Sequence, residues 1–285
     1  MKVLKKLLGT QDTDLFLTKY FSRLPFASQG GGEDFKGILK WSDINDIVKT
    51  KKSHLRIVQN GRMIKDYADL NNEEVLNYYK NGNTILIKNA ELSHALCKVL
   101  ANDFSSSFFT PVDIQLYCTP EGHNAFGWHY DVEEVFIIQT QGSKAYTIRQ
   151  NTIHPNPLVS SIPKDLGYEM EKSDLEISVT LKEGDWLYIP SGWWHIAKTQ
   201  EESMHISIGL MPRSAIDFLS YLQKDLASSP YWRIRMPVHK QFSSTKEEVD
   251  FYQEAIGQLG QDILRRISEP RFVEDFLKST KENFS

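Results

Sequence analysis

Two histidines and one aspartate, in two separate segments, have the types and spacing of a metal site. His129 and Asp131 lie in segment 127–131 (GWHYD), and His195 ends segment 193–195 (WWH). Two imidazoles and one carboxylate can occupy one face of a ferrous ion and leave its other positions open for substrate and oxygen. In a strand, His129 and Asp131 would project from the same face. The pattern predicts an iron site, and zinc is the natural competitor because His and Asp also bind zinc.

The residues around His195 are the strongest support for this prediction. Segment 184–195 (GDWLYIPSGWWH) predicts a turn, an apolar strand, a Pro-Ser-Gly corner and a histidine presented where the chain re-enters a sheet. Gly184 and Gly192 supply backbone conformations that other residues resist. A His-x-Asp pair alone often arises by chance, whereas this longer pattern is far more demanding.

The third ligand requires a second strand folded over the first, and the middle of the chain predicts such a scaffold. Short β-type runs separated by turn residues are typical of a sandwich or barrel and not of alternating βαβ units. These runs span 112–118, 134–139, 144–150, 177–181, 185–190, 194–198 and 204–211. The proline-containing insert 151–173 has little helix or strand character, and we expect it to border the site.

Helices flank the β-rich part on both sides. Upstream, the pattern predicts helices over 12–24, 42–49, 71–81 and 92–104 and strands over 54–59 and 84–88, with segment 28–32 as a loop. Asn71 and Glu74 have the spacing of a capping box, as do Thr245 and Glu248. Downstream of Pro212 the helices are expected to begin near Ile216, to run from Thr245 to about 267, and to cover 269–278. We therefore expect a lead-in over 1–83 packed on the core, a β core over 84–213 and a helical segment over 214–285.

Composition and charge narrow the class of protein. The 285 residues carry a formal net charge of −4, which argues against direct binding of nucleic acid. Cys97 and Cys118 form no zinc or disulfide pattern and are expected to be small buried thiols. No segment has the length of a membrane span, and the N-terminus lacks the pattern of a signal peptide. These observations predict a reduced, cytoplasmic protein without a membrane partner.

Several motifs resemble one known family. Segment 117–120 (YCTP), the run 129–142 with His129, Asp131 and Gly142, and the lead-in 16–25 resemble the JmjC-type members of the cupin superfamily. Within them the sequence is most similar to the ribosomal oxygenase group, over about residues 13–212. The resemblance implies a mainly β double-stranded β-helix (jelly roll), with helical additions and a C-terminal helical segment. It also implies Fe(II), 2-oxoglutarate as cosubstrate and O2.

The same resemblance suggests cosubstrate-binding residues. Lys144 matches the position of the family's lysine or arginine that pairs with the distal carboxylate of 2-oxoglutarate, a charge-assisted contact. Without the family match, Lys144 would be a solvated turn lysine. Gln115 falls where relatives often carry an asparagine that helps to hold the cosubstrate. His205 matches a histidine that is not a ligand and is expected to be a packed, hydrogen-bonded core residue.

The implied activity is hydroxylation of a side chain in a protein or peptide. Trp128, Tyr130 and Trp194, with Trp193, either form an aromatic rim for the substrate or belong to the core. The loop residues His123 and His154 either touch substrate or lie on the surface. The resemblance implies a homodimer through the C-terminal helices, although segment 214–285 is too short for the group's full C-terminal region. A free small molecule as substrate and a non-oxygenase metal-dependent cupin (an isomerase or a binding module) remain the alternatives.

Overall fold

The computed structural model describes residues 1–67, 69–162 and 176–282. Contacts divide the chain into two compact units, Met1–Pro212 and Arg213–Ser285, and this division falls beside the boundary expected near Arg213. The first unit contains all the strands. The lead-in 1–83 belongs to this same unit, because its strands extend the sheet of the core.

The first unit combines β-strands with helices that precede the β-rich part. Its helices are α1 (Lys2–Leu8), α2 (Thr13–Leu15), α3 (Trp41–Thr50), α4 (Asn72–Lys80) and α5 (Ala95–Phe108). Its strands are β1 (Phe26–Ser28), β2 (His54–Gln59), β3 (Arg62–Lys65), β4 (Thr84–Lys88), β5 (Val112–Thr119), β6 (Glu134–Gln141), β7 (Lys144–Arg149), β8 (Glu176–Leu181), β9 (Trp186–Ile189), β10 (Trp194–Thr199) and β11 (Ser203–Leu210). The seven strands predicted downstream of residue 111 are thus confirmed with small shifts of their ends.

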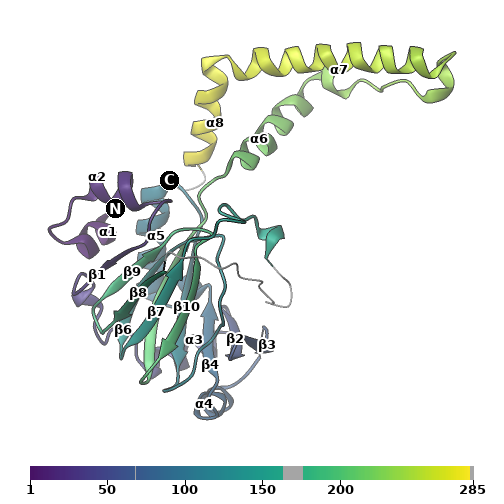
Figure 1. Cartoon of the computed structure of the whole chain (residues 1–285). Coiled ribbons are helices and arrows are strands. Elements are labelled where there is room, and N and C mark those ends of the chain that lie inside the picture. Colours follow the sequence, from purple (N-terminus) through teal and green to yellow (C-terminus); the bar gives the residue numbers. More distant parts are fainter. Residues whose placement is uncertain (68, 163–175, 283–285) are drawn as a thin grey trace. The chain divides into compact units, whose positions relative to one another are not determined.

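The strands form two antiparallel sheets (Figure 1). The larger sheet has the order β1-β9-β6-β11-β5-β4-β2-β3, and the smaller has the order β10-β7-β8. Strand β11 lies in the middle of the larger sheet, where His205 pairs with Tyr117 of β5 and with Gln139 of β6. The predicted fold class, a jelly roll with helical additions, is confirmed by this antiparallel core.

Alternation along the strands separates two apolar clusters. On β6, Phe136 and Ile138 point to the outer face of the larger sheet, where they pack with residues of α1, α3, α4 and α5. Val135 and Ile137 point to the opposite face and pack with Ile148 and other residues of the smaller sheet. Because successive side chains point to opposite faces, both faces of the larger sheet are covered.

The lead-in differs from its predicted elements in several places. The helix expected over 12–24 ends at Tyr20, since α2 continues only as a π-helical turn over Phe16–Tyr20. Strand β1 was not predicted; it pairs with β9 and begins two residues before the expected loop. The capping box of α4 is confirmed: Asn71 Oδ1 accepts from Glu73 N and Glu74 N, and Glu74 Oε2 accepts from Asn71 N.

The insert predicted over 151–173 is described only in its first half, because residues 163–173 lie outside the described residues. The described half contains a short 3₁₀ turn over Val159–Ser161 and no strand. Asn151 anchors its start, where Asn151 Oδ1 accepts a hydrogen bond from His154 N at 2.8 Å.

The second unit is helical, with α6 (Ala215–Ser228), α7 (Thr245–Ile267) and α8 (Pro270–Glu282). Leu222, Leu226 and Phe272 form its small buried cluster. The capping box predicted from Thr245 and Glu248 is wrong by one residue. Ser244 is the N-cap, and its Oγ accepts from Glu247 N at 3.2 Å. No helix within the described residues combines the length and apolar character that a membrane crossing requires.

Candidate metal and cosubstrate site

The backbone itself brings the two halves of the metal motif together. His129 and His195 form an isolated antiparallel bridge, in which His129 N donates to His195 O at 3.1 Å and His195 N donates to His129 O at 2.8 Å. Two residues that exchange both hydrogen bonds present their side chains on the same side of the ladder. Segment 127–133 is otherwise not a strand, so the expected strand geometry for His129 and Asp131 is replaced by this single bridge.

Further contacts fix the corner that carries His195. Gly192 N donates to Asp131 O at 2.8 Å, and Ser191 Oγ donates to Val132 O at 2.9 Å. Gly192 has φ +79°, and a Cβ there would lie 2.7 Å from Pro155 O. A larger residue would be strained and would clash, so glycine at this position allows the corner to close over the metal motif.

The three predicted ligands converge. One candidate donor atom from each of His129, Asp131 and His195 lies within 4.8 Å of the others. His129 Nδ1 lies 2.9 Å from Gly127 O, and His195 Nδ1 lies 3.0 Å from Trp193 O. A carbonyl can only accept, so each Nδ1 carries a proton, and Nε2 is the nitrogen of each ring that is left to bind a metal.

Burial and mutual contacts set the protonation of the triad. Burial lowers the pKa of His129 to about 4, and the nearby His195 adds to this effect. Burial also opposes protonation of His195, but the contact of its Nε2 with Asp131 Oδ2, 3.4 Å away, raises its pKa. For Asp131, burial opposes ionisation, yet the contact with His195 and the charges of both imidazoles lower its pKa to about 2. The site thus holds a carboxylate and a neutral imidazole, as metal binding requires.

Lys144 lies deep between the two sheets and is 2% exposed. Its Nζ lies 3.3 Å from Thr119 Oγ1, and the ammonium faces the ring of Tyr117 at 5.8 Å. Among the residues that the structure describes, no carboxylate forms an ion pair with it. Burial accordingly lowers its pKa to about 7. A buried ammonium without a counter-ion is costly, and an anionic ligand beside it would relieve that cost.

A small inner cavity connects Lys144 to the triad. It is lined by His129, Asp131, His195 and Lys144 and also by Tyr146 and His205. Tyr146 Oη and His205 Nδ1 are buried and have no hydrogen-bond partner within the described part of the chain. Together with the unpaired ammonium, these polar atoms fit a bound carboxylate. Thr119 and Tyr146 were missed by sequence reasoning; the signal was alternation, because Thr119 shares a strand face with Tyr117 and Tyr146 shares one with Lys144.

A second, outer cavity of about 390 Å³ meets the inner one at the metal motif. The two cavities share Tyr117, Phe126, His129 and Asp131. The outer cavity is further lined by residues of β2 to β5, of the segment around the metal motif and of the insert: Arg56, Met63, Leu86, Lys88, Gln115, Trp128, Glu133 and Ile162. The presence of Ile162 places the insert beside the site, as expected.

The predicted substrate and cosubstrate residues divide between the cavity and the core. Trp128 lines the outer cavity and stacks on the Arg149 guanidinium at 4.6 Å. Tyr130 and Trp194 are each 3% exposed and pack edge to face at 4.8 Å, and they line neither of these two cavities. Trp193 lies in the cluster between the sheets. Gln115 lines the outer cavity, and both ends of its amide are hydrogen-bonded to the protein.

The other histidines and the cysteines singled out in the sequence lie outside the metal triad. His205 is packed and stacks on Tyr117 with ring centroids 4.6 Å apart, although its Nδ1 lacks the expected hydrogen bond. His123 and His154 line neither cavity, and His154 is exposed. Cys97 and Cys118 are buried free thiols.

The fold and the site together are similar to those of JmjC-type cupins. Residues 93–218 match the family model described as the JmjC domain. This match covers all three residues of the triad and Lys144, and it confirms the resemblance predicted from the motifs.

Relatives place the chain near the ribosomal oxygenases. It is 30% identical over 183 residues to ribosomal oxygenase 2 of Bos taurus, covering 61% of this chain and 36% of that protein. It is 27% identical over 150 residues to the bifunctional lysine-specific demethylase and histidyl-hydroxylase NO66 of Drosophila persimilis, covering 52% of this chain and 21% of that one. The chain thus spans about a third or less of these curated relatives.

A solved structure shares the fold over nearly the whole chain. The ribosomal oxygenase YcfD of Escherichia coli, in complex with cobalt and 2-oxoglutarate, superposes with a TM-score of 0.60 at 18% identity. The similarity covers 95% of this chain and 71% of that one. At this identity the likeness establishes the fold alone.

Proposed function

We propose that this chain is a 2-oxoglutarate-dependent dioxygenase that hydroxylates a side chain of a protein or peptide. The observation that carries the proposal is the convergence of His129, Asp131 and His195 beside the unpaired ammonium of Lys144. A metal face with open positions and a buried cation for a carboxylate are the two requirements of this chemistry. The cavity that holds both is lined by residues of both sheets.

The metal motif, Lys144 and two neutral neighbours of Lys144 have roles in this proposal. His129 and His195 would hold Fe(II) through Nε2, and Asp131 would hold it through its carboxylate. Lys144 would bind one carboxylate of 2-oxoglutarate, with Thr119 and Tyr146 as neutral partners. When bound, Fe(II) and 2-oxoglutarate supply oxidation of a C–H bond by O2, with release of succinate and CO2.

The remaining task of the chain is orientation and exclusion of water. Val135, Ile137 and Ala197 line the inner cavity with apolar surface beside the triad. An apolar wall strengthens the contact between Lys144 and a carboxylate, because charges interact more strongly in a low-dielectric interior. No side-chain nucleophile is required for this reaction, and none of the roles above assigns one.

A protein or peptide substrate is supported by the outer cavity and by the names of the relatives. The cavity of about 390 Å³ is large enough for a side chain with part of its backbone and leads to the triad. The relatives are named as a histidyl-hydroxylase and as ribosomal oxygenases, activities on proteins. The substrate of this chain is inferred from them only as a class.

We also infer that the helical unit forms a homodimer in the cytoplasm. Its helices leave large apolar side chains exposed, among them Leu219, Phe251, Ile256, Leu264 and Leu277. Exposed apolar side chains of this size on several helices are expected to be covered by another molecule, here a second copy. The two free thiols fit a reducing compartment. Sedimentation equilibrium of the full chain tests the dimer, and a monomer at micromolar concentration would contradict it.

The activity is tested by succinate formation. Purified full-length protein with Fe(II), ascorbate and 2-oxoglutarate is expected to form succinate slowly without added substrate. His129→Ala and Asp131→Ala should abolish it, since each removes a metal ligand. If the wild-type protein neither binds 2-oxoglutarate nor forms succinate, the chain is a non-oxygenase cupin.

The substrate class is tested by mass. Lysate proteins and peptides are incubated with the wild-type protein or with Asp131→Ala, and a gain of one oxygen atom is sought by intact-mass and peptide analysis. The proposal expects the gain in protein material and only with the wild-type protein. A gain confined to small metabolites would instead support a free small molecule as substrate.

A further inference from the structure

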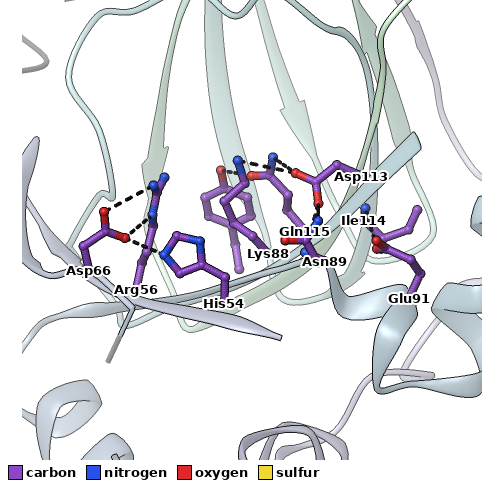
Figure 2. A network of polar contacts seen from close by, with 10 residues as sticks. His54, Arg56, Asp66, Lys88, Asn89, Glu91, Asp113, Ile114 and Gln115 are labelled. Carbon is purple, nitrogen blue, oxygen red and sulfur yellow. Dashed lines mark hydrogen bonds and ion pairs between the residues drawn. The ribbon is translucent and has the colours of Figure 1, made fainter. Parts of the chain in front are cut away.

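A chain of polar contacts runs along one face of β4 and β5 into the outer cavity (Figure 2). Lys88 Nζ lies 3.4 Å from Asp113 Oδ2, and Gln115 Nε2 donates to the same oxygen at 2.8 Å. Tyr117 Oη then donates to Gln115 Oε1 at 3.0 Å. Residues 113, 115 and 117 alternate along β5 and so share a face. The chain of contacts ends at a tyrosine that lines both cavities.

The side chain of Asp113 is held in place at the start of this series of polar contacts. Its Oδ1 accepts from Asn89 N at 2.9 Å and from Asn89 Nδ2 at 3.2 Å, so both carboxylate oxygens are engaged. Figure 2 shows Asp113 between Asn89 on one side and Lys88 and Gln115 on the other. Rotation of the Asp113 carboxylate would break several contacts at once.

The ionised carboxylate also fixes the direction of every hydrogen bond that follows. A carboxylate only accepts, so the amide of Gln115 must turn its NH2 group toward Asp113. Its carbonyl oxygen then faces Tyr117, and the hydroxyl of Tyr117 must donate to it. The single proton of that hydroxyl is thereby committed to Gln115. What remains for the cavity is the pair of acceptor lone pairs on the Tyr117 oxygen.

We propose that Asp113 and Gln115 are positioning residues that make Tyr117 a hydrogen-bond acceptor toward the outer cavity. The substrate group that lies against Tyr117 is therefore a donor, an N–H or O–H. This inference deepens the proposed function and rests on it for the identity of the outer cavity as the substrate site. It also takes Gln115 out of the cosubstrate-binding set, because both ends of its amide are used within the protein.

Two test variants and two control variants separate this role from simpler ones. Gln115→Leu leaves the Tyr117 hydroxyl without its acceptor at similar side-chain volume. Asp113→Asn offers an NH2 group to Gln115, so that the Gln115 amide can turn over and donate to Tyr117, which reverses the hydrogen bond. Lys88→Met removes the ion pair but leaves the Asp113 carboxylate in place. Gln59→Leu makes the matched substitution on β2, where Gln59 Nε2 donates to Asn81 O at 3.3 Å.

The experiment measures the hydroxyl of Tyr117 directly by NMR of full-length protein labelled with ¹³C at tyrosine Cζ. The Tyr117 signal is assigned by its loss in Tyr117→Phe and followed in the metal-free protein, so no turnover is needed. Gln115→Leu and Asp113→Asn are expected to move the signal, in different directions. Lys88→Met and Gln59→Leu are expected to leave it in place. An unmoved signal in Gln115→Leu or Asp113→Asn would overturn the proposal, as would an equal movement in the controls.

Titration with 2-oxoglutarate in the Zn(II)-loaded protein distinguishes the competing role for Gln115. The proposal expects Gln115→Leu to keep the affinity of the wild-type protein within about twofold, a difference of only a few tenths of a kcal/mol. A loss of about tenfold or more would place Gln115 on the cosubstrate and overturn its assignment as a positioning residue. If no variant and no wild-type protein binds 2-oxoglutarate, the proposed function fails, while the NMR result still decides the polarity of Tyr117.

Discussion

Substituting methionine for Lys144 is expected to stabilise the ligand-free protein and to weaken 2-oxoglutarate binding. Burial lowers the pKa of Lys144 from 10.5 to about 7, which at about 1.36 kcal/mol per unit corresponds to roughly 4–5 kcal/mol of opposition to the charged form. Replacing a buried charged group by an apolar one of similar size is neutral or gains about 1–4 kcal/mol. We expect Lys144→Met to gain within that range at pH 7.

The gain is measured by urea unfolding of the metal-free protein, followed by tryptophan fluorescence. Lys198→Met is the matched control, because Lys198 is exposed on the neighbouring strand β10, where a substitution changes stability by no more than about 0.5 kcal/mol. Binding should respond in the opposite direction. Loss of a hydrogen bond to a charged group costs about 1.5–3 kcal/mol, so the Kd of 2-oxoglutarate should rise by about tenfold to a hundredfold. A variant that is less stable and binds 2-oxoglutarate normally would refute the assignment of Lys144.

Three further outcomes follow from the site. The folded pKa of Lys144, about 7, lies below its unfolded value of 10.5, so the stability of the ligand-free wild-type protein should rise with pH between these values. The affinity for 2-oxoglutarate should fall on the order of tenfold from pH 7 to 8.5, because the ammonium loses its proton. Calorimetric titration across pH checks both trends, and Lys144→Met should lack both. Gly142→Ala should cost at least about 1–3 kcal/mol in thermal unfolding, because its φ is +67° and a Cβ would lie 1.9 Å from Glu202 O; Gly122→Ala, with φ +72° but open space, should cost less. Trp128→Ala should raise the KM for a protein substrate and leave substrate-free succinate formation nearly unchanged, since Trp128 lines only the outer cavity.

The sequence predicted the donors of the site better than the geometry that joins them. Sequence reasoning could pick out four residues, because their types and local motifs are unusual: His129, Asp131, His195 and Lys144. The bridge between His129 and His195 could not be predicted, since it depends on two backbone segments far apart in the chain. Local alternation alone suggested a strand around His129, which the structure replaces by a bend with one paired residue.

Residues that act through neighbours were the least predictable. Thr119 acquires a role only because its strand β5, in the other sheet, lies beside Lys144, whereas Tyr146 shares a strand face with Lys144. Gln115 shows the reverse case. Its position in the motif suggested contact with the cosubstrate, but Asp113, two residues earlier on the same strand face, engages its amide. The aromatic residues beside His195 were also not placed by the sequence, and the structure buries both Trp193 and Trp194.

The helices and strands also differ in how well the sequence predicts them, depending on whether they rest on sequence neighbours or on distant pairing. Alternating runs and the Asn71 capping box were predicted correctly because they depend on neighbours in sequence. Strand β1 was missed because it has only three residues and exists through pairing with β9, far downstream. The helix before it ends early at a π-helical turn, where Phe16 is drawn into an aromatic cluster with Phe26, Phe136 and Tyr188.

The most direct test of the account is the fate of labelled oxygen. Full-length protein with Fe(II), ascorbate and 2-oxoglutarate is incubated under ¹⁸O2, and the succinate is analysed by mass spectrometry. In a 2-oxoglutarate-dependent dioxygenase, one atom of O2 enters the new carboxylate of succinate. The account predicts singly ¹⁸O-labelled succinate from the wild-type protein and none from Asp131→Ala, which lacks the carboxylate of the triad. Absence of succinate, or succinate whose new oxygen comes from water, would contradict it.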